Sequence, residues 1–294
     1  MIVVSGASGA LGRLVVERLL EREPAERIAV SVRDPARVAD LEQRGVRVRR
    51  ADYADPDSLA RAFEGASRVL VVSANTVGDE AVRLNRAGIE AAVAAGAQHV
   101  LYTSHMGADP SSPFPPMITH AATEEILRGC GAPATTALRH GFYAATVPRL
   151  VTGALATGEL RAPGDGPVAW TAHADLAEAA AVALTADALA TDAPADTATP
   201  PLTGPEALTL VDVAALVAEL AGREVRRVVV CDDAYRAGLV THGVPAAGAD
   251  MLVGMFAAAR QGAFAPADPA LSAVIGRPTT PLHDVLADHL APAH

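Results

Sequence analysis

Three glycines near the start of the chain have the spacing of a phosphate-binding turn. Gly6, Gly9 and Gly12 follow a short apolar run, Ile2–Val4, and precede an amphipathic helix pattern. Gly6 permits a tight turn, Gly9 lets backbone approach a pyrophosphate, and Gly12 lets the helix pack against the strand. The helix N-terminus adds N–H groups and the positive end of a dipole. The predicted dinucleotide contacts in this turn are Gly6, Ser8, Gly9, Ala10, Leu11 and Gly12.

The residues after the second apolar run distinguish NADP from NAD. Arg33 offers a guanidinium that fits a 2′-phosphate, and Arg37 adds a second cation one helical turn later. NAD-binding proteins usually place an acidic residue here, which makes Asp34 the alternative. Its position before Pro35 is typical of a helix cap, so we expect NADP(H). Asp52 either accepts a hydrogen bond from the adenine amine or serves as a turn residue.

Alternating strand and helix patterns in the first half predict an α/β fold, a Rossmann doubly wound parallel sheet. The predicted strands are Ile2–Val4, Ile28–Val32, Val46–Arg49, Val69–Val72, His99–Tyr102 and Ala134–Leu138. The predicted helices are Leu11–Arg22, Pro35–Arg44, Asp57–Phe63, Asp79–Ala95 and Met117–Gly129. We expect an NADP-binding domain at residues 1–145 and a mainly substrate-binding lobe at residues 146–294, with some of its elements returning to the sheet.

The second half of the chain does not continue the regular alternation of strand and helix patterns. Asp175 is expected to cap a helix, and Asp192–Pro205 to form a loop with one strand. Thr209 begins a capping-box pattern for a helix that ends at Gly222. The further predicted elements are a strand at Arg226–Val230 and helices at Asp232–Leu239 and Ala249–Arg260.

Composition disfavours several kinds of partner. A net charge of −10 argues against nucleic acid and anionic membranes. The two cysteines, Cys130 and Cys231, lack CxxC spacing, which is typical of a reducing cytosol. No apolar run is long enough to cross a bilayer, and the histidines show no metal-ligand spacing. We expect a cytoplasmic monomer or homodimer without a metal.

Seven segments spread over the chain, taken together, resemble the NmrA-like group of atypical short-chain dehydrogenases. They are Gly6–Gly12, Val32–Ala36, Ala51–Tyr53, Leu101–Ser104, His120–Glu124, Leu138–Tyr143 and Ile275–Thr280. Within the group, the chain is most similar to the bacterial NADPH:quinone oxidoreductases of the second type and to triphenylmethane reductases. The resemblance implies a Rossmann fold, bound NADPH and hydride transfer to a quinone-like acceptor.

The resemblance also implies roles for individual residues. Asp52 would hold the cofactor together with the glycine turn and Arg33. Ser73 and Thr103-Ser104 would border the nicotinamide ribose. The residues implied or expected beside the substrate ring are Phe142, Tyr143 and His105.

The chain departs from the group at the positions used for proton transfer. The Tyr-x-x-x-Lys pair of typical short-chain dehydrogenases is absent, and its nearest equivalent is His120-x-x-x-Glu124. The quinone reductases carry Lys where Glu125 stands, and Glu-Asn where Ala145-Thr146 stand. Reduction of a simple ketone needs a strong proton donor, whereas a quinone needs little acid help. The departures therefore favour a conjugated, electron-poor acceptor.

Three side chains are candidate catalytic groups, and each has a structural alternative. His120 is a proton donor with a pKa near neutrality, or a helix-start histidine bonded to backbone or water. Tyr143 is a second donor, or a packed core residue. Ser104 orients a carbonyl, or closes the end of its strand.

Two functions remain open from the sequence. The first is an NADPH-dependent reductase of a small-molecule aromatic or quinone substrate. The alanine-rich, lysine-poor composition is typical of GC-rich bacterial genomes, which leaves a natural-product tailoring step open. The alternative is an NADP(H)-sensing regulatory protein without turnover, which the missing Tyr/Lys pair and Glu125 would suit.

Overall fold

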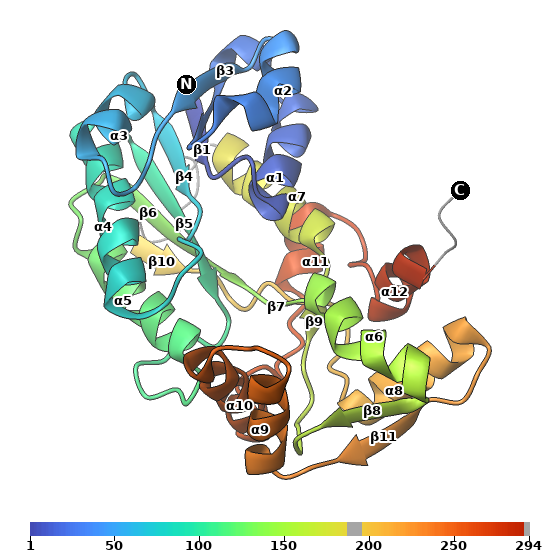
Figure 1. The fold of residues 1–294 in the computed structure, drawn as a ribbon. Helices are drawn as coiled ribbons and strands as arrows, with labels where there is room; N and C mark the ends of the chain where they lie inside the picture. The colour runs from blue at the N-terminus through green and yellow to red at the C-terminus, as the bar shows by residue number, and fades with distance from the viewer. Residues whose placement is uncertain (187–195, 291–294) are drawn as a thin grey trace.

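A computed structural model describes residues 1–186 and 196–290. The first half of the chain and one strand of the second half form a single parallel sheet (Figure 1). The sheet strands are β1 (Ile2–Ser5), β2 (Ile28–Val32), β3 (Arg47–Arg50), β4 (Arg68–Val71), β5 (His99–His105), β6 (Ala134–His140) and β10 (Asp196–Ala198). Their order is β10-β6-β5-β4-β1-β2-β3, with every neighbouring pair parallel. The chain runs outward from β1 in one direction and from β4 in the other. The carboxyl ends of β1 and β4 therefore form the topological switch point, which is the place where α/β sheets bind ligands.

Helices cover both faces of the sheet (Figure 1). On one face lie α1 (Ala10–Leu20), α2 (Ala39–Gln43), α7 (His173–Thr185) and α11 (Ala270–Ile275), with η1 (Ala25–Arg27) and η2 (Pro35–Val38) nearby. On the other face lie α3 (Pro56–Phe63), α4 (Gly78–Ala94) and α5 (Pro115–Arg128). Both faces are therefore buried, which explains the continuous apolar runs of β1 and β2. In the described ranges, no helix is both long and apolar enough to cross a membrane.

The predicted α/β fold is confirmed, with differences at the ends of elements. β5 runs on to His105 and β6 to His140, beyond the apolar runs that predicted them. Both extensions are mostly buried polar residues, so hydrophobicity gave no signal for them. The helix expected over Pro35–Arg44 divides into η2 and α2.

The remaining elements form a smaller lobe with its own apolar core. They are β7 (Phe142–Tyr143), η3 (Ala144–Thr146), α6 (Val147–Thr157), β8 (Glu159–Ala162), β9 (Trp170–Thr171), α8 (Leu210–Ala221), β11 (Arg226–Val229), α9 (Asp232–Thr241), α10 (Ala246–Arg260) and α12 (Leu282–Leu290). The predicted capping box is present, since Thr209 and Asp212 bond each other's backbone N–H groups. The strand expected within Asp192–Pro205 is β10; residues 192–195 of that segment lie outside the described ranges.

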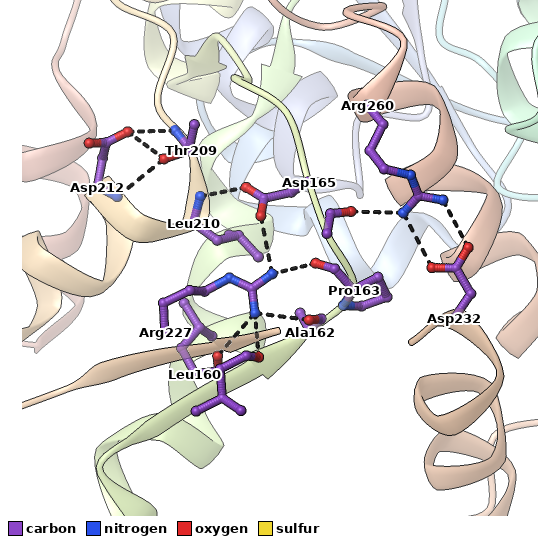
Figure 2. A network of polar contacts seen from close by, with 12 residues as sticks. Leu160, Ala162, Pro163, Asp165, Thr209, Leu210, Asp212, Arg227, Asp232 and Arg260 are labelled. Atoms are coloured by element: carbon purple, nitrogen blue, oxygen red, sulfur yellow. Dashed lines mark hydrogen bonds and ion pairs between the residues drawn. The ribbon is translucent and has the colours of Figure 1, made fainter. Parts of the chain in front are cut away.

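A buried arginine holds the lobe together (Figure 2). Arg227 on β11 donates to the Ala162 carbonyl of β8 (2.9 Å) and pairs with Asp165 (3.1 Å). The other Asp165 oxygen accepts from the Leu210 N–H at the start of α8 (2.7 Å). One ion pair therefore joins the β8–β11 ribbon, the loop after β8 and α8.

Asp175 does not cap α7 as expected, because the helix begins at His173 with Ala172 as its N-cap. The fully buried Asp175 carboxylate instead accepts from the Thr280 N–H (2.6 Å) and pairs with Arg277 (2.8 Å). This contact fastens the Ile275–Thr280 segment to α7, a helix that packs on the sheet.

The turn after β1 depends on a close approach that only glycine allows. Gly6 has a φ of +65°, which favours glycine. A Cβ on Gly12 would lie 2.6 Å from the Gly6 carbonyl oxygen, a backbone atom that cannot swing away. Gly12 therefore sets how closely α1 packs on the turn.

We expect Gly12→Ala to lower the free energy of unfolding by about 1–3 kcal/mol, the usual cost of overpacking. Gly153→Ala is a matched control, because Gly153 also lies within a helix but meets nothing within 4 Å. The control should be neutral or stabilising by up to about 1 kcal/mol. Urea unfolding measures both, and equal stability of the two variants would contradict the packing role of Gly12.

Three histidines at the ends of β5 and β6 are buried. Burial lowers the pKa of His99 to about 4, with a smaller contribution from the Arg68 charge, and that of His140 to about 3. Burial also lowers the pKa of His105 well below its usual value. These imidazoles are therefore neutral in the folded protein at pH 7.

We expect the free energy of unfolding to decrease as the pH falls from about 6.5 toward 4. In this window the unfolded chain takes up protons at these histidines and the folded chain does not. Each histidine contributes a slope of up to about 1.4 kcal/mol per pH unit. Urea unfolding at a series of pH values measures the slope, and His99→Gln should reduce it. Stability that is constant across this window would contradict the burial of neutral imidazoles.

Candidate active site

A cleft of about 780 Å³ opens at the carboxyl ends of β1 to β4. It contains eight of the predicted cofactor residues: Gly6, Ser8, Gly9, Ala10, Arg33, Arg37, Asp52 and Ser73. The predicted residues Leu11, Gly12 and Thr103 are buried behind it. The cleft therefore lies where strand order reverses, and most of the predicted residues meet there.

The N-terminus of α1 faces this cleft. Gly9 is the N-cap residue, no side chain among the described residues caps it, and the first turn carries no acidic residue. A Cβ on Gly9 would stand 3.3 Å from the Gly6 oxygen, so the turn is already tight. Uncapped N–H groups and a positive dipole end are the features that bind a pyrophosphate.

Two guanidiniums at the cleft have no partner within the described residues. Arg33 and Arg37 are both exposed, and neither makes an ion pair or a side-chain hydrogen bond there. Asp34 caps the next turn by accepting from the Ala36 N–H (3.1 Å), as predicted. A carboxylate used in this way leaves the positive charges free for a phosphate, and the site fits NADP(H).

Asp52, Ser73 and Thr103 have different positions relative to the cleft. One Asp52 oxygen accepts from the Ala54 N–H (2.9 Å), so the residue is a turn former that also borders the cleft. Thr103 is buried, and its hydroxyl accepts from the Ser73 N–H (2.8 Å). The expectation that Thr103 borders the ribose is corrected: it shapes the loop after β4 from behind.

The cleft also contains residues that the sequence did not single out. They are Ser5, Ser31, Val32, Ala51, Tyr53, Val72, Ala74, Asn75, Thr76, Glu80 and Leu84. Most follow the ends of β1 to β4 or open α4. The loop after β4 could have been found from the strand order alone, because it lies at the switch point.

His120 lies on α5 beside the loop after β4. Its Nδ1 is 2.9 Å from the Tyr102 hydroxyl. Burial lowers the pKa of His120 to about 4, although the Glu124 charge opposes this. The expectation of a pKa near neutrality is therefore wrong, and at pH 7 His120 is a neutral imidazole.

Ser104 points into an ion pair and away from the cleft. Its hydroxyl donates to Glu124 (2.6 Å), which also accepts two bonds from Arg139 (2.9 and 2.7 Å). Ser104 and Glu124 are both buried. The geometry corrects the expectation that Ser104 orients a substrate carbonyl, and instead supports the alternative, that it closes the end of β5.

The predicted substrate residues belong to an aromatic cluster. Phe142 is 8% exposed, with ring centroids 4.9 Å from Phe264, 5.4 Å from Trp170 and 5.5 Å from His105. The apolar cavity beneath it holds only about 20 Å³, too little for a ring. Contact of Phe142 or His105 with substrate stays a prediction that this packing does not favour.

Tyr143 is the better placed aromatic candidate, because it is only partly buried. Its ring centroid lies 4.3 Å from that of His173, and its hydroxyl lies 3.4 Å from His140 Nδ1. Burial raises the pKa of Tyr143 to about 12, so it is a weak acid. Its catalytic role stays a prediction.

Comparison with known proteins supports the same assignment. The model of the NmrA-like family matches residues 1–283. Quinone oxidoreductase 2 of Escherichia coli (strain K12) is 35% identical over 283 residues, which cover 96% of each chain. The crystal structure of an NADPH-dependent quinone oxidoreductase from Escherichia coli, complexed with NADPH, superposes with a TM-score of 0.90 at 34% identity, covering 99% of both chains.

Triphenylmethane reductase from Citrobacter sp., complexed with NADP(H), superposes with a TM-score of 0.89 at 29% identity, covering 99% of this chain and 100% of that one. These likenesses extend over both the sheet and the smaller lobe, so they are not limited to the glycine turn. The chain belongs to the NmrA-like family.

Proposed function

We propose that the protein is an NADPH-dependent reductase that transfers a hydride to a conjugated, electron-poor acceptor such as a quinone. The observation that carries this proposal is the cleft in which Arg33 and Arg37, both without a partner among the described residues, stand beside the N-terminus of α1. The names of the relatives, a quinone oxidoreductase and a triphenylmethane reductase, support a conjugated acceptor.

Different residues of the cleft would bind different parts of the cofactor. The backbone from Gly6 to Ala10 would hold the pyrophosphate, while Arg33 and Arg37 would hold the 2′-phosphate. Ser73 and Ala74 would border the nicotinamide ribose. NADPH, when bound, supplies the hydride. We further propose that residues 1–145 hold the cofactor and residues 146–294 mainly shape the acceptor site.

The weak acidity of the candidate donors favours the same acceptor class. His120 is neutral, and the pKa of Tyr143 is about 12. A simple ketone would need an effective acid at its oxygen, whereas a quinone distributes the developing charge over a conjugated system. Oxidation of NADPH by a panel of quinones, followed by absorbance, tests this assignment. Tight binding of NADPH and NADP⁺ with no turnover would instead indicate a sensing protein.

We expect Arg33→Ala to weaken NADPH binding by about 1.5–3 kcal/mol, the range for hydrogen bonds to a charged group, while NADH binding barely changes. Arg223→Ala is a matched control, because Arg223 is also exposed but lies just after α8 in the smaller lobe. It should bind both cofactors as the parent does. Calorimetric titration measures all affinities, and an equal loss for NADPH and NADH would remove Arg33 from the 2′-phosphate site.

A further inference from the structure

A buried asparagine connects the cofactor loop to His120. Asn85 on α4 accepts from the Ala74 N–H (2.8 Å), and Ala74 lines the cleft. The Asn85 Nδ2 donates to the Tyr102 hydroxyl and to Thr123 (both 3.2 Å). The Tyr102 hydroxyl in turn lies 2.9 Å from His120 Nδ1. Four elements thus meet in one chain of hydrogen bonds.

The direction of each bond follows from the groups available. The Asn85 oxygen bonds a backbone N–H, so its amide nitrogen must be the group that faces Tyr102. Because Tyr102 accepts from that nitrogen, its own proton is available for His120 Nδ1. A neutral His120 that accepts at Nδ1 carries its proton on Nε2.

The Nε2 atom of His120 is the end of this chain of hydrogen bonds. It has no hydrogen-bond partner in the described part of the chain and, unlike His140 Nε2, it is not completely buried. The other groups around the ring are His105 on β5, Glu124 one turn along α5, and His140 on β6. Its neighbour Thr119 accepts from the Gly78 N–H (3.0 Å) at the start of α4, so this part of α5 lies against the segment that follows the cleft loop.

We propose that Asn85 is a positioning residue: through Tyr102 it holds His120 as the Nε2–H tautomer, which presents a neutral N–H donor to the acceptor oxygen. The inference rests on the proposed function and deepens it. Its consequence is that the loop bordering the nicotinamide ribose and the hydrogen-bond donor to substrate are fixed by one side chain.

His120 in this arrangement donates a hydrogen bond and keeps its proton. The hydride adds to the conjugated acceptor, and the electron pair moves onto the acceptor oxygen. If His120 lost its Nε2 proton, it would become an imidazolate, or it would take the Tyr102 proton and leave a tyrosinate. Burial raises the pKa of Tyr102, so the tyrosinate is unfavourable. The proton that completes the reduction therefore comes from water to that oxygen.

Asn85→Asp tests the relay with a change of one atom. The aspartate keeps an oxygen for the Ala74 N–H but replaces the amide donor with an acceptor, so Tyr102 should donate to it and His120 should move its proton to Nδ1. ¹⁵N NMR of labelled histidine, assigned with His120→Gln, measures the tautomer. We expect Nε2–H in the parent and Nδ1–H in the variant. We also expect a kcat for quinone reduction lower by about 10- to 100-fold, with unchanged NADPH affinity.

Tyr102→Phe provides a second route, because it removes the hydroxyl and keeps the ring. Its kcat should fall to a similar extent, whereas Tyr235→Phe, on α9 in the smaller lobe, should retain the parent kcat. A parent His120 with its proton on Nδ1, or an Asn85→Asp variant with parental tautomer and kcat, would overturn the relay. Expected tautomers without any quinone turnover by the parent would support the hydrogen-bond geometry and contradict the proposed function.

Discussion

The contact between the Gly12 backbone and the Gly6 carbonyl governs the cofactor half of this protein. It allows α1 to start directly above the end of β1, so the helix N-terminus opens into the cleft. The cleft in turn lies at the carboxyl ends of the parallel strands β1 and β4, where the strand order reverses, and this leaves room for a ligand. The guanidiniums of Arg33 and Arg37 border the same space from the end of β2 and the turn that follows.

Behind the cleft, buried polar side chains form directional hydrogen bonds, which orient backbone and side-chain groups more specifically than apolar packing does. The Thr103 hydroxyl holds the Ser73 N–H, and Asn85 holds the Ala74 N–H. On the neighbouring strands, Ser104 is held by an ion pair between α5 and β6. Because an unpaired buried polar group is costly, the bonds from Thr103 and Asn85 restrict the loop after β4 to few conformations.

Local patterns made much of this architecture predictable. The glycine turn, the cap at Asp34 and the capping box at Thr209 each depend on residues a few positions apart, and all three are present. The helices α6 and α12 were not predicted: α6 contains Pro148 and Gly153, which disfavour a helix, and α12 has only nine residues.

The chemical state of the site was less accessible to sequence reasoning. The neutral state of His120 depends on burial by β5 and α5, and the relay joins residues 85, 102 and 120 through tertiary contacts. For Ser104 the sequence left two roles open, and the partner that decides between them, Glu124, lies twenty positions away. His120 and Ser104 were singled out from the sequence without their partners, and Asn85 and Tyr102 were not singled out.

A crystal structure of the protein with bound NADPH would show directly whether the cofactor occupies this cleft. We expect the 2′-phosphate within hydrogen-bond distance of Arg33 and the pyrophosphate over the N-terminus of α1. We also expect the nicotinamide ribose beside Ser73 and Ala74. A 2′-phosphate bound elsewhere, for example at the arginine-lined hollow of Arg50 and Arg61 beside β3, would contradict this expectation.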